Sequence, residues 1–176
     1  MNEPHIKRAL ISVSDKLGLS DFAKGLVAAG IEVYSTGGTA AQLESEDIPV
    51  QDVSAYPGFP EMMAGRIKTL HPFIFGGILC RHDRDDDMQA LERHGILSFE
   101  LVVVNLYPFE ATVAREGVTL EEAIEKIDIG GPSLVRAAAK NHAFTTIATH
   151  PEQYSEILEQ IQQGSGTTLE LRRKLA

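Results

Sequence analysis

The sequence is poor in several residue types whose abundance would mark a particular class of protein. Among its 176 residues it has no tryptophan and a single cysteine, Cys80. One cysteine allows no internal disulfide, which excludes a disulfide-stapled secreted domain and favours a reducing compartment, the cytoplasm. No run approaches the roughly 20 apolar residues of a transmembrane helix, and residues 1–8 contain no apolar signal core. We therefore expect a cytoplasmic protein with no membrane partner.

Basic residues are also scarce, with 16 Lys and Arg against 25 Asp and Glu and a formal net charge of −9. Nucleic acids require a basic surface, so they are excluded as partners of the chain as a whole. An anionic ligand must instead be held by a local cluster of cations. Such a cluster is present where Arg66, Lys68 and Thr69 precede Pro72. Because Pro72 disfavours helix at the residue before it, we predict a ligand-binding loop over Gly65–Pro72.

Apolar runs alternate with segments of helical period along the chain. The expected strands are 8–13, 31–35, 50–53, 101–106 and 145–149, and the expected helices are 17–29, 40–46, 86–94, 119–126, 131–139 and 151–162. The valine-rich run at 101–106 is typical of a central parallel strand that is covered on both faces. The pattern predicts an α/β fold, a three-layer sandwich around a mostly parallel sheet.

The length and the 43% hydrophobic content suit one well-buried core. We expect a single domain over residues 1–163. Residues 164–176 are then expected to form a hinge and a further helix, leading toward a domain that this sequence does not contain.

Polar side chains follow the first expected strand, where ligands bind in open α/β sheets. Ser12, Ser14 and Lys16 supply two hydroxyls and an ammonium just before a helix. Such a group suits a phosphate at a helix amino terminus. The alternative is that Ser14 or Asp15 simply caps that helix.

A second polar turn follows the second expected strand, with Ser35, Gly37, Gly38 and Thr39 in sequence. Paired glycines let backbone N–H groups approach an oxyanion closely. The turn lacks the Gly-Lys-Ser/Thr of a Walker loop and the full dinucleotide glycine pattern. Phosphate binding and a plain strand-to-helix turn both remain open from this motif alone.

Further polar groups lie later in the chain. Asp128 precedes Ile129, Gly130 and Gly131 at the start of a helix, where its carboxylate either caps the helix or takes a proton from a substrate N–H. Asn105 ends the most apolar strand, and a buried amide there must be hydrogen-bonded. Tyr107 follows it and either donates a hydrogen bond or only packs.

Two other features invite a chemical interpretation. His82 stands before Asp83 and Asp85–Asp87, but the run has no second histidine at ligand spacing, so we interpret it as a solvated helix start rather than a metal site. Cys80 has no nearby activating pattern and is interpreted as a small buried thiol.

Taken together, these motifs closely resemble the inosine monophosphate (IMP) cyclohydrolase family, the amino-terminal domain of a bifunctional purine biosynthesis enzyme (AICAR transformylase/IMP cyclohydrolase). The resemblance runs from about Arg8 to Glu159 and includes the Arg136–Asn141 stretch. One departure is Phe73 and Phe75, where many members have Lys and His.

The resemblance implies a sheet similar to that of methylglyoxal synthase and a hydrolase of the cyclic amidine class. It implies dehydrative ring closure of 5-formamido-1-(5-phosphoribosyl)imidazole-4-carboxamide to IMP, the final step of purine biosynthesis de novo. It implies a homodimer that acts on a small ribonucleotide, without cofactor or metal.

The resemblance also assigns roles to residues. The catalytic residues would be Lys68, Asp128, Tyr107 and Lys140. The substrate-binding residues would be Ser12, Ser14, Lys16, Ser35, Gly37, Gly38, Thr39, Arg66, Thr69, Asn105, Ile129, Gly130 and Gly131. Two alternatives are a methylglyoxal synthase that releases phosphate from dihydroxyacetone phosphate, and a regulatory nucleotide-binding domain like that of carbamoyl phosphate synthetase.

Overall fold

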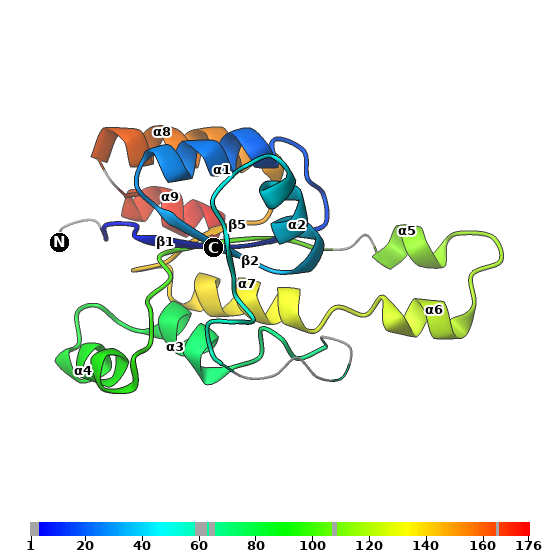
Figure 1. Cartoon of the computed structure of the whole chain (residues 1–176), viewed down its shortest axis with the longest axis horizontal. Coiled ribbons are helices and arrows are strands. Elements are labelled where there is room, and N and C mark those ends of the chain that lie inside the picture. The colour runs from blue at the N-terminus through cyan, green and yellow to red at the C-terminus, as the bar shows by residue number, and fades with distance from the viewer. Residues whose placement is uncertain (1–3, 59–62, 64–65, 107–108, 165) are drawn as a thin grey trace.

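The fold is a five-stranded parallel sheet between two layers of helices, seen in a computed structural model that describes residues 4–58, 63, 66–106, 109–164 and 166–176 (Figure 1). The strands are β1 (Arg8–Val13), β2 (Glu32–Ser35), β3 (Gln51–Asp52), β4 (Leu101–Asn105) and β5 (Thr146–Ala148). They lie in the order β3-β2-β1-β4-β5. The predicted α/β sandwich is confirmed.

The described helices follow the strands in alternation along most of the chain. They are α1 (Leu19–Ala28), α2 (Gly37–Ser45), α3 (Pro72–Leu79), α4 (Asp85–His94), α5 (Phe109–Val113), α6 (Leu120–Glu125), α7 (Gly130–Lys140), α8 (Tyr154–Gly164) and α9 (Leu169–Leu175), with a 3-10 turn η2 (Pro151–Gln153). None of these helices is long and apolar enough to cross a bilayer.

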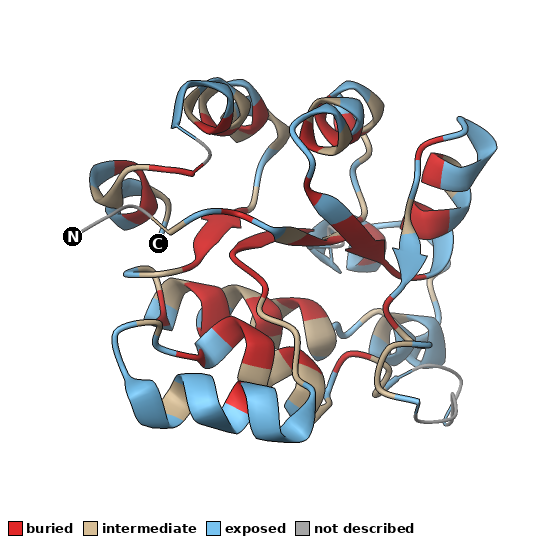
Figure 2. Ribbon diagram, turned by 60° about the vertical axis from the view of Figure 1, so that its left-hand side comes forward, coloured by how far each residue is buried: buried red, intermediate tan, exposed pale blue. Residues whose placement is uncertain are grey.

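Alternating side chains of the central strands build one core on each face of the sheet. Ile11 and Val103 pack with α1, α8 and α9, whereas Leu10 and Val102 pack with α3 and α7. Figure 2 shows the buried residues gathered between the sheet and both helical layers. Burial on both faces explains why these strands are continuously apolar.

Helix α3 differs from the sequence prediction, which placed a loop up to Pro72. Proline's fixed φ suits the first turn of a helix, and α3 begins at Pro72 with His71 as its N-cap. The His71 ring accepts a hydrogen bond from the Phe73 N–H at 3.1 Å. Ile74 and Ile78, one helical turn apart, are both fully buried against the sheet. The described loop is therefore 66–71, followed directly by a packed helix.

Helix α9 lies within residues 164–176, where the sequence predicts a hinge followed by a helix. Leu171 and Arg172 are each 3% exposed, and α9 packs against β5. The Arg172 guanidinium donates hydrogen bonds to the carbonyls of His142, Ala143 and Thr167. The last helix is thus part of the same packed body.

Replacing Arg172 is expected to destabilise the fold strongly, because the buried guanidinium joins three backbone carbonyls that would lose their donor. We expect Arg172→Ala to lower the free energy of unfolding by about 3 kcal/mol. Urea unfolding followed by circular dichroism measures this value. The exposed neighbour Arg173 is the control, and Arg173→Ala should stay within about 0.5 kcal/mol of the parent. Equal midpoints for the two variants would contradict this account of Arg172.

Residues 109–129, called the arm below, project from the body with α5 and α6 side by side (Figure 1). A capping box between Thr119 and Glu122 starts α6, yet no residue of α6 is buried. Large apolar side chains of the arm are exposed, among them Leu120 at 77% and Ile124 at 52%. The arm therefore has no hydrophobic core of its own among its described residues.

Candidate active site

A pocket of about 570 Å³ opens beyond the carboxyl ends of the central strands, where the sequence predicted the site. Eight predicted residues line it: Ser12, Arg66, Lys68, Thr69, Asp128, Ile129, Gly130 and Gly131. Sequence reasoning missed six others: Thr36, Ile124, Glu125, Lys126, Ile127 and Leu134. Most of the missed residues come from the arm, whose position could not be deduced from local pattern.

One end of the pocket gathers positive charge at the start of α2. Gly37 has φ +50°, and a Cβ there would lie 3.2 Å from the Lys68 Nζ. The Lys68 ammonium therefore lies directly against the first turn of α2. The N-cap residue Thr36 makes no side-chain capping bond, so the first N–H groups of α2 lack that partner. An ammonium beside such N–H groups is suited to bind an oxyanion.

Lys16 adds a second cation near this turn. Its Nζ donates to the Val13 carbonyl at 3.2 Å and approaches the Thr39 Oγ1 at 3.4 Å. Partial burial lowers the pKa of Lys16 from its ordinary value. Within the described residues no carboxylate forms a salt bridge with it, which leaves its charge available to an anionic ligand.

The capping alternative for the first turn is wrong. Helix α1 begins at Leu19 and its N-cap is Gly18, not Ser14 or Asp15. The Asp15 carboxylate instead accepts the Leu17 N–H at 2.9 Å and closes a local turn. Ser14 and Lys16 thus lie in a loop ahead of the helix.

Asp128 lies at the start of α7 and does hold its first turn. Oδ1 accepts the Gly131 N–H at 2.9 Å, so the structural role proposed for this carboxylate is confirmed. A Cβ at Gly131 would lie 2.3 Å from Asp128 Oδ2, and only glycine fits there. Since Asp128 also lines the pocket, the same bond that caps the helix fixes the carboxylate in place.

Contacts connect the two ends of the pocket. A Cβ at Gly130 would lie 2.8 Å from the Thr69 Oγ1, so the loop that carries Lys68 lies against the start of α7. At the mouth, Arg66 forms a salt bridge with Glu125 of the arm, and both side chains are exposed. These residues are 59 positions apart, which is why the sequence did not suggest the pair.

Three residues predicted to bind ligand form hydrogen bonds within the protein. Ser35 is fully buried, and its hydroxyl donates to the Ile11 carbonyl at 2.7 Å. Thr39, 4% exposed, donates to the Val13 carbonyl at 3.0 Å and accepts the Val13 N–H at 3.2 Å. Both hydroxyls are thus hydrogen-bonded to the backbone of β1, and contact of Ser35 and Thr39 with ligand stays a prediction. The Asn105 side chain likewise forms hydrogen bonds with the backbone of Ser14 and Asp15.

Of the predicted catalytic residues, Lys140 does not line this pocket. Tyr107 lies outside the described residues. Lys140 ends α7 and lines a different hollow, together with Leu79 and Arg81. Because α7 rises about 1.5 Å per residue from Gly130, its two ends lie roughly 15 Å apart. Lys140 and Asp128 of one chain therefore do not share a site.

Cys80, His82 and the two phenylalanines of α3 all make packing contacts. Cys80 is buried, which confirms the interpretation as a core thiol, and burial raises its pKa to about 12. His82 precedes α4 and stacks on Phe144 with ring centroids 5.3 Å apart. Phe73 lies against Tyr56, and Phe75 packs on the core, so both phenylalanines serve packing.

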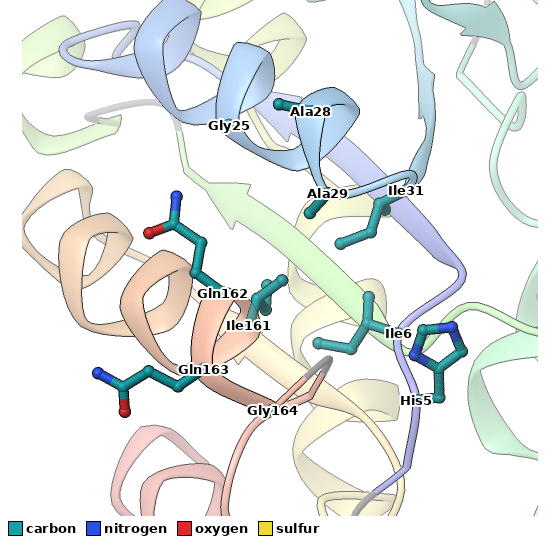
Figure 3. Close-up of a pocket in the computed structure, with 10 residues that line it drawn as sticks. All are labelled: His5, Ile6, Gly25, Ala28, Ala29, Ile31, Ile161, Gln162, Gln163 and Gly164. Atoms are coloured by element: carbon teal, nitrogen blue, oxygen red, sulfur yellow. The ribbon is translucent and has the colours of Figure 1, made fainter.

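A second hollow of about 540 Å³ lies between the carboxyl-terminal ends of α1 and α8 (Figure 3). Small residues such as Gly25, Ala28 and Ala29 form one wall, and the side chains of Gln162 and Gln163 extend from α8. No Lys, Arg, Asp or Glu of the described chain lines it. His5 is the one titratable side chain among its described lining residues, so the hollow lacks the cluster of cations that the first pocket offers a phosphate.

Comparisons with known proteins find a matching family and similar proteins. The family described as MGS-like domain matches residues 18–133. Over 97% of this chain, the sequence is 63% identical to the bifunctional purine biosynthesis protein PurH of Rhodopirellula baltica and 52% identical to that of Listeria innocua. The chain spans about a third of the length of these relatives (33% and 34%).

A solved structure resembles the whole fold. The crystal structure of ForH superimposes with a TM-score of 0.85 at 31% sequence identity, covering 97% of this chain and 89% of that one. Nearly all of the chain thus has a counterpart in a protein of similar length.

Proposed function

Because the chain belongs to the MGS-like domain family and is 63% identical to a PurH protein over nearly its whole length, we propose that it is an IMP cyclohydrolase. It closes the second ring of 5-formamido-1-(5-phosphoribosyl)imidazole-4-carboxamide to give IMP and water. The observation that carries this proposal is that Lys68 and Asp128 line the same pocket, with the Lys68 ammonium against the start of α2.

Ring closure joins two unreactive groups, a carboxamide nitrogen and a formamide carbonyl. In the proposed mechanism Asp128 accepts the carboxamide proton as the nitrogen attacks the formyl carbon. The Lys68 ammonium stabilises the negative charge that develops on the formyl oxygen, an effect worth several kcal/mol in a site with little water. That oxygen takes up the proton and leaves as water together with the proton released by the formamide nitrogen, which thereby forms the C=N bond of the new ring. Tyr107 is proposed to orient the formamide.

The phosphate end of the substrate is proposed to bind at the start of α2. The N–H groups of Gly37 and Gly38, the Lys16 ammonium and the hydroxyls of Ser12 and Ser14 supply the donors. Arg66 is proposed to reach the phosphate from the mouth, in competition with its partner Glu125. Thr69 and the backbone of 129–131 then face the ribose and base.

The test of this function is a direct assay. Incubating the chain with the formamido ribotide should produce IMP, followed by its ultraviolet absorbance, while dihydroxyacetone phosphate should give no methylglyoxal. Methylglyoxal formation would support the lyase instead. Tight nucleotide binding without turnover of either compound would favour the regulatory domain.

A cytoplasmic homodimer is part of the proposal. The apolar side chains exposed on the arm, such as Leu120, Ile127 and Ile129, supply surface that a second copy would cover. If Lys140 is catalytic, it must act in the site of a second copy, since α7 separates it from Asp128 of its own chain.

Mixing two inactive variants tests this arrangement. A heterodimer of Lys68→Ala and Lys140→Ala chains has one doubly altered site and one intact site when Lys140 acts across the dimer. We expect the purified heterodimer to regain about half of the parent activity, although each variant alone is inactive. An inactive heterodimer would contradict action across the dimer, and an active Lys140→Ala homodimer would contradict a catalytic Lys140.

A further inference from the structure

Asn105, the last residue of β4, sends its side chain across to the turn that follows β1. Its Oδ1 accepts the N–H groups of Ser14 at 2.6 Å and Asp15 at 2.9 Å. Its Nδ2 donates to the Asp15 carbonyl at 2.8 Å. Two strand ends that are adjacent in the sheet are thereby joined by three side-chain hydrogen bonds.

These bonds use most of the hydrogen-bonding capacity of the amide. A carboxamide has two acceptor positions on oxygen and two N–H donors. Both oxygen positions and one donor are engaged with residues 14 and 15. After these three bonds the Asn105 side chain keeps one N–H with which to contact a ligand directly.

The turn held by Asn105 carries the groups proposed to bind phosphate. Ser14 supplies a hydroxyl, and Lys16, two residues on, supplies an ammonium. Thr39 fixes the other side of this turn through the N–H and carbonyl of Val13. Asn105 and Thr39 can therefore determine the position of the Lys16 ammonium without contacting the ligand themselves.

We propose that Asn105 is a positioning residue that aligns the turn 14–16 with the phosphate of a ribonucleotide. The inference rests on the proposed binding of a ribonucleotide at this edge of the sheet. It assigns Asn105 an effect on phosphate recognition, carried through the backbone of Ser14 and Asp15, rather than on the base or on the ring-closing step.

The test compares a nucleotide with its nucleoside. Binding of IMP and of inosine is measured for the parent, for Asn105→Ala and for Asn105→Asp, which keeps the size and an acceptor but loses the donor to Asp15. Both variants should weaken IMP binding by about tenfold or more and change inosine binding by less than about twofold. In turnover, KM should rise by a similar factor while kcat stays within about threefold.

Asn141 provides a matched control at the other end of the molecule. It is buried, and its Nδ2 donates to the carbonyls of Ile78 and Cys80, both at 2.8 Å. Asn141→Ala should lower stability without changing the ratio of IMP to inosine affinity. A loss of that ratio only in the Asn105 variants therefore separates positioning from general destabilisation.

Amide hydrogen exchange measures directly how firmly Asn105 holds the backbone of Ser14 and Asp15. In Asn105→Ala the N–H groups of Ser14 and Asp15 should exchange about tenfold faster or more, while Asn141→Ala should leave them unchanged. Equal losses for IMP and inosine, unchanged IMP binding in Asn105→Asp, or unchanged exchange at Ser14 and Asp15 would each overturn the inference. Absence of ring closure by the parent would instead refute the proposed function and leave this result standing.

Discussion

Replacing Asp128 with asparagine is expected to slow ring closure by at least about a hundredfold while leaving IMP binding nearly unchanged. The amide keeps an oxygen that can accept the Gly131 N–H, so the start of α7 and the shape of the pocket are preserved. What is lost is the negative charge that is proposed to accept the carboxamide proton. The effect should therefore appear in kcat rather than in KM.

Steady-state turnover of the formamido ribotide and calorimetric binding of IMP together measure this expectation. Glu121 offers a matched control, because it is a carboxylate on exposed α6 and does not line the pocket. Glu121→Gln should retain the parent rate within about twofold. Parent-like turnover by Asp128→Asn would remove Asp128 from the mechanism.

Replacing Lys68 with methionine is expected to have an effect of similar size, at least about a hundredfold on kcat. Methionine matches the length of the aliphatic stem but carries no charge to stabilise the formyl oxygen. Lys68→Arg should recover little of the activity, since the Nζ already lies against the backbone of Gly37 and a planar guanidinium is larger.

Single-turnover rates for Lys68→Met and Lys68→Arg measure the chemical step without product release. The control is Lys24→Met, a cation on α1 outside the pocket that is paired with Glu46. If Lys68→Met turned over at the parent rate, stabilisation of the oxyanion would have to come from another group. Recovery of full activity by Lys68→Arg would show that charge alone, and not its position, is required.

Much of the fold was predictable because it follows from the buried strands. Strand β1 begins at Arg8 and ends at Val13 as expected, since a short apolar run between polar residues leaves little choice. The presence of Lys68 and Asp128 in one pocket was expected from the resemblance to the IMP cyclohydrolase family, since neither residue directly follows a strand.

What sequence reasoning missed depends on register and on long-range contacts. The polar side chains of Ser35 and Thr39 bond to the backbone of β1, and only the pairing of strands decides whether a hydroxyl faces a neighbour or a ligand. Pro72 alone does not decide between a loop and a helix, because proline both ends regular structure and suits the first turn of a helix. The buried side chains of Ile74 and Ile78 show that a helix follows it.

The end of β4 contacts two separate segments of the proposed site. Asn105 is bonded to the turn that carries Lys16, and the next residue, Leu106, lies so near Gly131 that a Cβ there would be 2.8 Å from its Cδ2. One strand end thus fixes the distance between the turn that carries Lys16 and the carboxylate of Asp128. If a ribonucleotide binds as proposed, a molecule too short to reach from that turn to Asp128 would contact only one of the two.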